Sequence, residues 1–224
     1  MKDTPIFILV KDRLTCLKKL LDKLAEQSYQ NLHLIDTGST YEPMLEFQKG
    51  LSIPIHRCEP KGPPKFALWS CGILVQTGYA NKFYVLTDCD VIPDCPADWM
   101  KILYKALNKF KQFTKAGLGL RIDDIPDCYS RKKAVIAWER KFWKNSVGRE
   151  VYRAPVDTTL ALYRPGTRYT LKAVRIGGKY QARHLPWYQD SAHPTAEDLY
   201  YKAHLQPEAM AFWTRGVHPL TLVR

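Results

Sequence analysis

The sequence predicts an α/β fold with a mostly parallel, doubly wound sheet and an irregular C-terminal part. Short apolar runs alternate with segments of helical period along the first half of the chain, which is the pattern of a parallel sheet. Polar and glycine-containing turns follow the apolar runs, as expected at strand ends. No low-complexity linker divides the 224 residues, and 46% are hydrophobic, so we expect one domain with a substantial core.

In the first half, strands and helices are expected to alternate. A leucine repeat at helical spacing follows the first strand, and Asp12 or Thr15 could cap that helix. The expected strands are 5–10, 32–35, 53–56 and 83–86. The expected helices are 14–24, 41–49 and 66–77.

In the second half, an amphipathic helix at 100–113 and a strand at 117–122 are expected. A basic, aromatic helix at 131–145 follows, and a last strand is expected at 158–163. Beyond residue 166 the pattern predicts no regular element.

The net charge of +12 and the pI of about 9.4 favour acidic partners such as nucleotide phosphates, nucleic acid or an anionic membrane surface. A solvated basic surface is an equally simple interpretation. The six cysteines form no CxxC pair, which argues against a zinc knuckle and fits a reducing compartment. The N-terminus lacks a signal-peptide layout, and the longest apolar run, 66–75, is about half the length that a bilayer requires. We therefore expect a soluble, cytoplasmic protein with at most peripheral membrane contact.

Two carboxylates one residue apart follow an apolar run. Side chains alternate along a strand, so Asp88 and Asp90 should project to one side and Cys89 to the other. In open α/β sheets, ligands bind at the carboxyl ends of strands, and paired carboxylates there suit a hard divalent cation. A charged turn without a ligand is the alternative explanation of the same three residues.

Taken in order, several short segments resemble the small GT-A glycosyltransferases of the family-2-like type, which occur in bacteria and in large algal viruses. The resemblance covers nearly the whole chain, and the order and spacing of the segments carry it. These segments are 5–14, 36–40, 67–69, 87–90, 157–166 and 183–188.

The resemblance implies a GT-A nucleotide-diphospho-sugar transferase fold and a set of donor contacts. Asp36 would contact the base or ribose of the nucleotide, and Thr37 replaces the second acidic residue of the usual pattern, which leaves the base preference open. Asp88 would face the ribose and the metal, and Asp90 would bind the metal directly. Arg13 and Lys65 would meet the nucleotide or its diphosphate, and Trp69 would form part of the donor pocket wall.

His184 resembles the late histidine that completes the metal site in such enzymes. Carboxylate, imidazole and diphosphate ligands together suit Mn²⁺, with Mg²⁺ as the alternative. Packing of His184 against Trp187 and Tyr188 would explain the same residue without a metal.

The implied activity is transfer of a sugar from a nucleoside-diphosphate donor to a hydroxyl acceptor such as a glycan, with inversion expected. Residues 1–95 would form the nucleotide-binding half and 96–224 the acceptor-binding half. Inversion requires a carboxylate as general base. Asp157 is the first candidate, followed by Asp124 and Asp198; helix or turn capping is the alternative role for Asp157 and Asp198.

Two other functions compete with this one. Sugar-phosphate nucleotidyltransferases usually carry a glycine-rich loop after the first strand, whereas residues 10–14 contain no glycine. A basic nucleic-acid-binding module would fit the charge, but its lysines and arginines are spread along the chain and no binding motif is recognisable. We therefore expect no specific nucleic-acid partner.

Overall fold

The centre of the fold is the strand β1 (Ile6–Val10), whose five residues are all buried. Ile6, Ile8 and Val10 belong to one hydrophobic core, while Phe7 and Leu9 belong to a second core on the other face of the sheet. A strand that is apolar on both faces is expected inside a sheet with helices on both sides. The computed structural model describes residues 1–205 of the chain.

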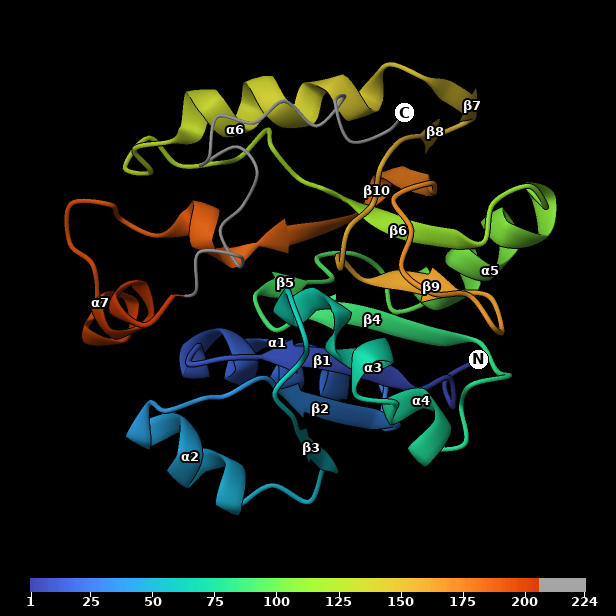
Figure 1. Cartoon of the computed structure of the whole chain (residues 1–224). Coiled ribbons are helices and arrows are strands. Elements are labelled where there is room, and N and C mark those ends of the chain that lie inside the picture. Colours follow the sequence, from blue (N-terminus) through green and yellow to red (C-terminus); the bar gives the residue numbers. More distant parts are fainter. Residues whose placement is uncertain (206–224) are drawn as a thin grey trace.

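The strands form one continuous sheet in the order β3-β2-β1-β4-β9-β6-β10-β8-β7, with β5 paired to β10 (Figure 1). Along this order, all strands except β9 and β8 run in the same direction. The remaining strands are β2 (Leu32–Asp36), β3 (Ile55–Arg57), β4 (Tyr84–Asp88), β5 (Val91–Ile92), β6 (Lys115–Leu120), β7 (Ser146–Gly148), β8 (Val151–Arg153), β9 (Ala161–Tyr163) and β10 (Val174–His184).

Helices cover both faces of the sheet, which confirms the predicted doubly wound α/β class. Helices α1 (Leu14–Glu26), α2 (Glu42–Lys49) and α5 (Trp99–Lys109) contribute to the first core. The short helices α3 (Ala67–Ser70) and α4 (Ile73–Gln76) contribute to the second. The other helical segments are η1 (Pro64–Phe66), α6 (Lys132–Glu139), η2 (Arg140–Trp143), η3 (Leu185–Tyr188) and α7 (Ala196–Ala203).

The expected continuous helix at 66–77 is wrong. Gly72 adopts a left-handed conformation with φ of 67°, which ends α3 and separates it from α4. Glycine tolerates this conformation because it has no Cβ. The chain can therefore turn sharply here while both short helices remain packed on the sheet.

The long strand β10 lies in the segment where the sequence pattern predicts no regular element. Its burial does not alternate: Val174–Gly177 are buried, Gly178 and Lys179 are exposed, and the pairing with β6 shifts register between Ile176 and Gln181. A bulge of this kind disrupts the two-residue period on which strand prediction depends. The strand ends at His184, one of the residues that the sequence suggested as a metal ligand.

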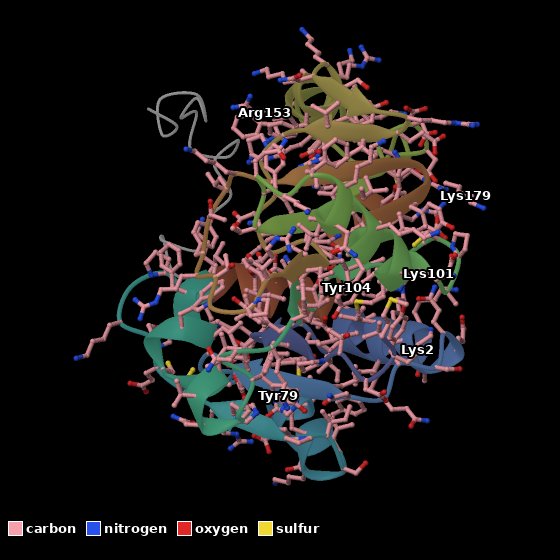
Figure 2. All side chains as sticks on the ribbon, turned by 90° about the vertical axis from the view of Figure 1, so that its right-hand side faces the viewer. Lys2, Tyr79, Lys101, Tyr104, Arg153 and Lys179 are labelled. Carbon is pink, nitrogen blue, oxygen red and sulfur yellow. The ribbon has the colours of Figure 1, made fainter. Side chains whose placement is uncertain are left out.

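Helix α6 is attached to the sheet by a buried ion pair between Glu139 and Arg175 of β10. In Figure 1 this helix lies across the top of the sheet, and α7 lies at its left-hand edge. The exposed basic side chains labelled in Figure 2, Lys2, Lys101, Arg153 and Lys179, come from separate parts of the chain. On this face the positive charge is thus distributed over several elements.

No helix within residues 1–205 is long and apolar enough to cross a membrane. All six cysteines are free thiols.

Candidate functional site

The candidate site lies where four strands of common direction end. Asp36 ends β2, Asp88 ends β4 and His184 ends β10, while β1 leads directly to Asp12 and Arg13. Because these strands run the same way, their carboxyl ends meet at one edge of the sheet, hereafter the carboxyl edge. Residues that are far apart in the sequence are thereby brought to one surface.

Asp90 and His184 are neighbours at this edge. His184 Nε2 lies 3.6 Å from Asp90 Oδ2, and the main-chain N–H of Leu185 donates to the Asp90 carbonyl at 2.8 Å. The imidazole also packs against Trp187, with ring centroids 4.8 Å apart. The two roles considered for His184, a ligand position and an aromatic contact, are thus compatible in one side-chain position.

Arg13 forms the other side of the Asp90 environment. Its Nε lies 3.7 Å from Asp90 Oδ2, and its guanidinium covers the ring of Tyr201 at 3.8 Å. The side chains of Arg13 and Asp90 are only 15% and 13% exposed, so their attraction is weakly screened. Burial alone would lower the pKa of Arg13, but the Asp90 charge together with Tyr201 and Cys16 outweighs it and the pKa is raised.

Several polar atoms around Asp90 lack a hydrogen-bond partner among the described residues. They include Asp90 Oδ1, His184 Nδ1 and Arg13 Nε, all of which are buried. Unpaired buried polar atoms are costly and point to a missing ligand, ion or water. Burial also lowers the pKa of His184, which keeps the imidazole in the neutral form that binds metals.

Asp90 and His184 together fit a metal site with two protein ligands. Within residues 1–205 no group of three or more histidine, cysteine, aspartate or glutamate side chains is arranged to hold a metal. An ion at this position would therefore need further oxygen ligands from a bound substrate. A carboxylate and an imidazole are a donor set that Mn²⁺ accepts.

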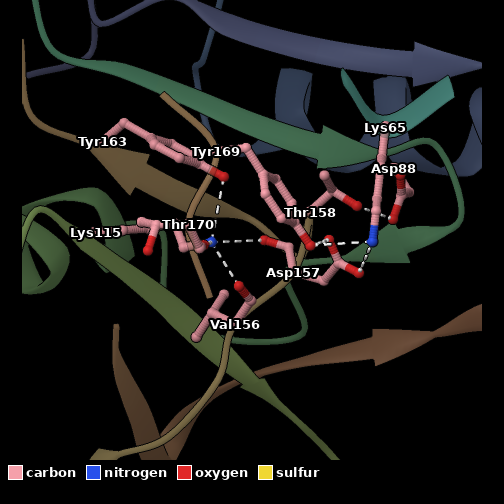
Figure 3. A network of polar contacts seen from close by, with 9 residues as sticks. All are labelled: Lys65, Asp88, Lys115, Val156, Asp157, Thr158, Tyr163, Tyr169 and Thr170. Atoms are coloured by element: carbon pink, nitrogen blue, oxygen red, sulfur yellow. Dashed lines mark hydrogen bonds and ion pairs between the residues drawn. The ribbon is translucent and has the colours of Figure 1, made fainter. Parts of the chain in front are cut away.

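Asp88 points into a second polar network (Figure 3). Its Oδ2 accepts a hydrogen bond from the Thr158 hydroxyl at 2.6 Å, and its N–H donates to the Thr158 carbonyl at 2.9 Å. Burial, followed by the negative charge of Asp90, raises the pKa of Asp88 well above its usual value. The two aspartates are thus close enough to interact electrically, although their side chains have different partners.

Asp157 lies beside Thr158 and is bound by two donors. The Tyr169 hydroxyl donates to Asp157 Oδ1 at 2.8 Å, and Lys65 Nζ lies 3.3 Å from Asp157 Oδ2 and 3.0 Å from the Tyr169 oxygen. The Asp157 side chain is 36% exposed, so a substrate hydroxyl could reach it. The negative charge of Asp88 contributes to the environment of Tyr169, whose pKa is raised mainly by burial.

Asp36 borders a cavity of about 350 Å³. Its Oδ1 accepts from the N–H groups of Gly38 and Ser39 at 3.2 and 2.8 Å, so it holds the turn that follows β2. Arg57 Nε lies 4.0 Å from Asp36 Oδ2. The cavity is within the size range of small-molecule sites. It is lined by Asp36, Gly38, Ser39, Leu45, Arg57, Cys58 and Glu59.

The sequence suggested Asp12 as a possible cap of α1, but the structure gives it a different role. Its φ is 50°, and its Oδ1 accepts from the N–H groups of Thr40 and Tyr41 at 2.7 and 2.8 Å. Asp12 therefore fixes the loop between β2 and α2, including one wall of the Asp36 cavity. Thr15 lies within the first turn of α1 and is not its cap.

Trp69 packs in an aromatic group beneath the Asp157 network. Its Nε1 donates to the Tyr84 hydroxyl at 3.0 Å, and its ring meets those of Tyr163 and Tyr169 at centroid distances of 5.6 and 6.0 Å. The cavity lining at Asp36 does not include Trp69. Trp69 thus contacts Tyr169 and lies outside the lining of the cavity at Asp36.

The other two carboxylates considered as the base have different surroundings. Asp124 accepts hydrogen bonds from Arg183 and Tyr188 at 2.5 and 2.6 Å. Asp198 forms the capping box of α7 with Thr195 and also accepts from Gln189 at 2.8 Å. Asp198 thus caps a helix, which is the alternative role that the sequence suggested for it.

Three contributors to this site were not identified from the sequence. Lys115 is fully buried beneath Asp157, Tyr169 belongs to an irregular segment, and Tyr201 lies on a helix that approaches Arg13 only in the folded chain. An isolated lysine in a strand-like run, 115–120, was the only available hint for the first. The other two depend on contacts between distant segments.

No family model matches the chain, and no curated protein matches it. Among solved structures, the chain is similar to residues 1–349 of S. aureus TarS at 11% identity and a TM-score of 0.44, covering 80% of this chain and 59% of that one. It is also similar to glucosyl-3-phosphoglycerate synthase from Mycobacterium tuberculosis with phosphoglyceric acid, at 12% identity and a TM-score of 0.42, covering 72% and 56%.

A further structure of that synthase, in complex with Mn²⁺ and UDP-glucose, is 14% identical over the same shares of the two chains, with a TM-score of 0.39. The chain thus spans less than two thirds of the length of these proteins. At such identities and TM-scores the similarity supports no conclusion about activity, which has to be argued from the carboxyl edge itself.

Proposed function

We propose that the protein is a metal-dependent glycosyltransferase of the GT-A type that transfers a sugar from a nucleoside-diphosphate donor to a hydroxyl acceptor. The observation that carries this proposal is that Asp36, Asp88 and His184 end three strands of common direction, with Asp90 two residues beyond Asp88 and beside His184. A cavity beside Asp36 offers space for a nucleoside, and the unpaired polar atoms around Asp90 offer a cation site.

The residues have distinct roles in the proposed reaction. The nucleoside would occupy the cavity beside Asp36, and Arg57 at its rim adds positive charge. Asp90 and His184 would hold Mn²⁺ or Mg²⁺, with Asp88 close enough to add its charge. A bound cation supplies charge neutralisation for the leaving diphosphate.

Cations of the protein itself supplement this effect. Arg13 lies beside Asp90, and Lys65 lies beside Asp157 within the electric field of Asp88. In a donor complex we expect one or both to approach the diphosphate. Fixed positive groups near the leaving oxygen stabilise the charge that develops as the bond between the anomeric carbon and the diphosphate breaks.

Asp157 is the proposed general base, and the reaction would invert the anomeric configuration. It is partly exposed, lies next to the residue that binds Asp88, and keeps its orientation through Tyr169. Lys65, which is paired with Asp157, would move toward the donor and leave the carboxylate free for the acceptor hydroxyl. Asp124 is a weaker candidate because it is ion-paired with both Arg121 and Arg183, and Asp198 is weaker because it forms the capping box of α7.

The first test is a thermal-shift panel of UDP, GDP, dTDP, ADP and CMP, each with and without Mn²⁺. A ligand present at 100 times its Kd stabilises the folded state by about 2.7 kcal/mol, which corresponds to roughly 5–10 °C for a chain of this size. We expect a shift with one nucleoside diphosphate and only with metal. Asp90→Asn should lose it, while Asp22→Asn, an exposed residue of α1, should keep it.

The absence of any metal-dependent shift would contradict the proposal. An unchanged shift in Asp90→Asn would mean that the metal binds at another position. The UDP-sugar or other donor selected by the panel can then be tested for transfer. Proton NMR of the product should show an inverted anomeric configuration. Asp157→Asn should reduce kcat by about 100-fold or more, as expected for loss of a general base.

A further inference from the structure

A lysine that the proposed chemistry does not use lies directly beneath Asp157. Lys115 begins β6 and is fully buried, which is rare for a lysine. Its stem lies within the sheet, and its Nζ points toward the segment that leads from Val156 to Thr158 (Figure 3). A buried ammonium is tolerated only where acceptors replace its hydration shell.

Lys115 has acceptors from two separate parts of the chain. Its Nζ donates to the carbonyl oxygens of Val156 and Thr170, and it lies 3.4 Å from the Asp157 carbonyl and 3.3 Å from the Tyr163 hydroxyl. The ammonium thus binds the backbone before β9 to the backbone that precedes β10. These are the two segments that supply Asp157 and Tyr169.

Other contacts also join these segments, among them the hydrogen bond from the Tyr169 hydroxyl to Asp157 Oδ1 at 2.8 Å. The main-chain N–H groups of Ala154 and Val156 donate to the carbonyls of Ala173 and Leu171, both at 3.3 Å, which is longer than a typical N–H···O bond. Leu160 has a positive φ of 44°, which is unfavourable for a branched side chain. To these contacts Lys115 adds hydrogen bonds with three carbonyl oxygens of the two segments.

We propose that Lys115 is a positioning residue, whose buried ammonium fixes the 156–158 and 169–171 segments so that Asp157 and Thr158 face Lys65 and Asp88. Its catalytic consequence rests on the proposed function, but the positioning itself does not. The charged groups that face it are Asp157 and Lys65, together with the hydroxyls of Tyr163 and Tyr169. Burial lowers the pKa of Lys115 to about 7.

The state of protonation decides how many acceptors Lys115 can satisfy. The ammonium has three donors, whereas the neutral amine has two. Around pH 7 and above, the folded protein therefore loses one of the hydrogen bonds that join the two segments. The effect should be local, because Lys115 contacts these segments and not β1 or α1.

The test measures hydrogen exchange of the whole protein by mass spectrometry, with rates corrected for the intrinsic effect of pH. In the unmodified protein, we expect exchange in 156–160 and 169–173 to rise about tenfold relative to β1 and α1 between pH 6 and 8.5. Lys115→Met, which keeps an unbranched side chain of similar size without the charge, should show fast local exchange at both pH values. Lys105→Met, at an exposed position on α5, should behave like the unmodified protein.

Equal exchange in these segments at both pH values in the unmodified protein would overturn the proposal, even if Lys115→Met failed to fold. A uniform rise over the whole of Lys115→Met would also overturn it, because that result means a general core role. Mn²⁺-dependent UDP binding, measured in parallel, tests the proposed function separately from the positioning role of Lys115. Absence of binding in the unmodified protein counts against the proposed function alone, whereas the exchange data still decide the role of Lys115.

Discussion

Glu197 of α7 caps the first turn of α1, although 182 residues separate it from its partner Thr15. The Glu197 carboxylate accepts hydrogen bonds from the Thr15 N–H at 3.0 and 3.1 Å and from its hydroxyl at 2.9 Å. Helix α1 has no capping side chain of its own at Arg13. A carboxylate at a helix N-terminus satisfies free N–H groups and complements the helix dipole.

Glu197→Ala should therefore weaken both α1 and the attachment of α7. We expect a loss of about 1 kcal/mol in the free energy of unfolding, which is typical of a lost helix cap, and earlier cleavage near α7 in limited proteolysis. Glu26→Ala, at the other end of α1, is the matched control. Identical proteolysis and urea midpoints in the two variants would mean that the Glu197 cap contributes nothing.

His184→Ala should reduce Mn²⁺ affinity more than it reduces stability. In the proposed site His184 is one of two protein ligands, and even outer-sphere partners of a metal are worth about tenfold or more in affinity. Isothermal titration of Mn²⁺ in the presence of UDP measures the change. His193→Ala, at an exposed position paired with Asp190, is the control. Unchanged Mn²⁺ affinity would leave His184 with only its contact to Trp187.

His33 should make the protein sensitive to acid. Burial, followed by the neighbouring His56, lowers the pKa of His33 to about 4. His33 Nδ1 and His56 Nε2 are 3.1 Å apart, so the two rings cannot both be protonated without repulsion. Between pH 6.5 and 4 the unfolded chain binds more protons at this position than the folded chain does. The free energy of unfolding therefore falls as pH decreases through this window.

Replacing His33 by glutamine, which does not titrate, should flatten this dependence. Thermal melting at several pH values between 4 and 7 would show a smaller slope for His33→Gln than for the unmodified protein. His193→Gln should keep the original slope. Parallel curves for all three proteins would rule out His33 as the source of acid sensitivity.

The buried pair of Glu139 and Arg175 should be costly to break from one side. Their side chains are 5% and 4% exposed, and Arg175 also donates to the Pro155 carbonyl at 3.0 Å. Removing one partner from such a pair typically costs about 3–5 kcal/mol, because the other charge stays buried. Urea unfolding of Glu139→Leu and Arg175→Met should each show a loss of this size.

The double variant Glu139→Leu with Arg175→Met should recover most of that loss, because neither charge remains unpaired. Additive losses in the double variant would mean that the two residues act independently. The pair joins α6 to β10. Recovery of the free energy of unfolding in the double variant would therefore show that tertiary contacts, and not helix propensity alone, stabilise α6.

Much of the fold was predictable from the sequence because it depends on local periodicity. The leucines of α1 and the apolar run of β1 have the periods of a helix and of a strand buried on both faces, and both elements lie where they were predicted. The carboxyl ends of β2 and β4 could be located in the same way, so the position of Asp88 and Asp90 after β4 predicts a cation site, whereas the donor role of Asp36 is implied by the resemblance to GT-A glycosyltransferases.

The sequence by itself thus determined the α/β class, the order of the first elements and the acidic residues at strand ends. Only the tertiary structure decided which of them meet: His184 beside Asp90, Glu197 on α1, and Lys115 beneath Asp157. The physical reason is that these contacts join segments with no shared period. They form through the pairing of an irregular strand, β10, and through the burial of single polar groups, neither of which leaves a repeating pattern in the chain.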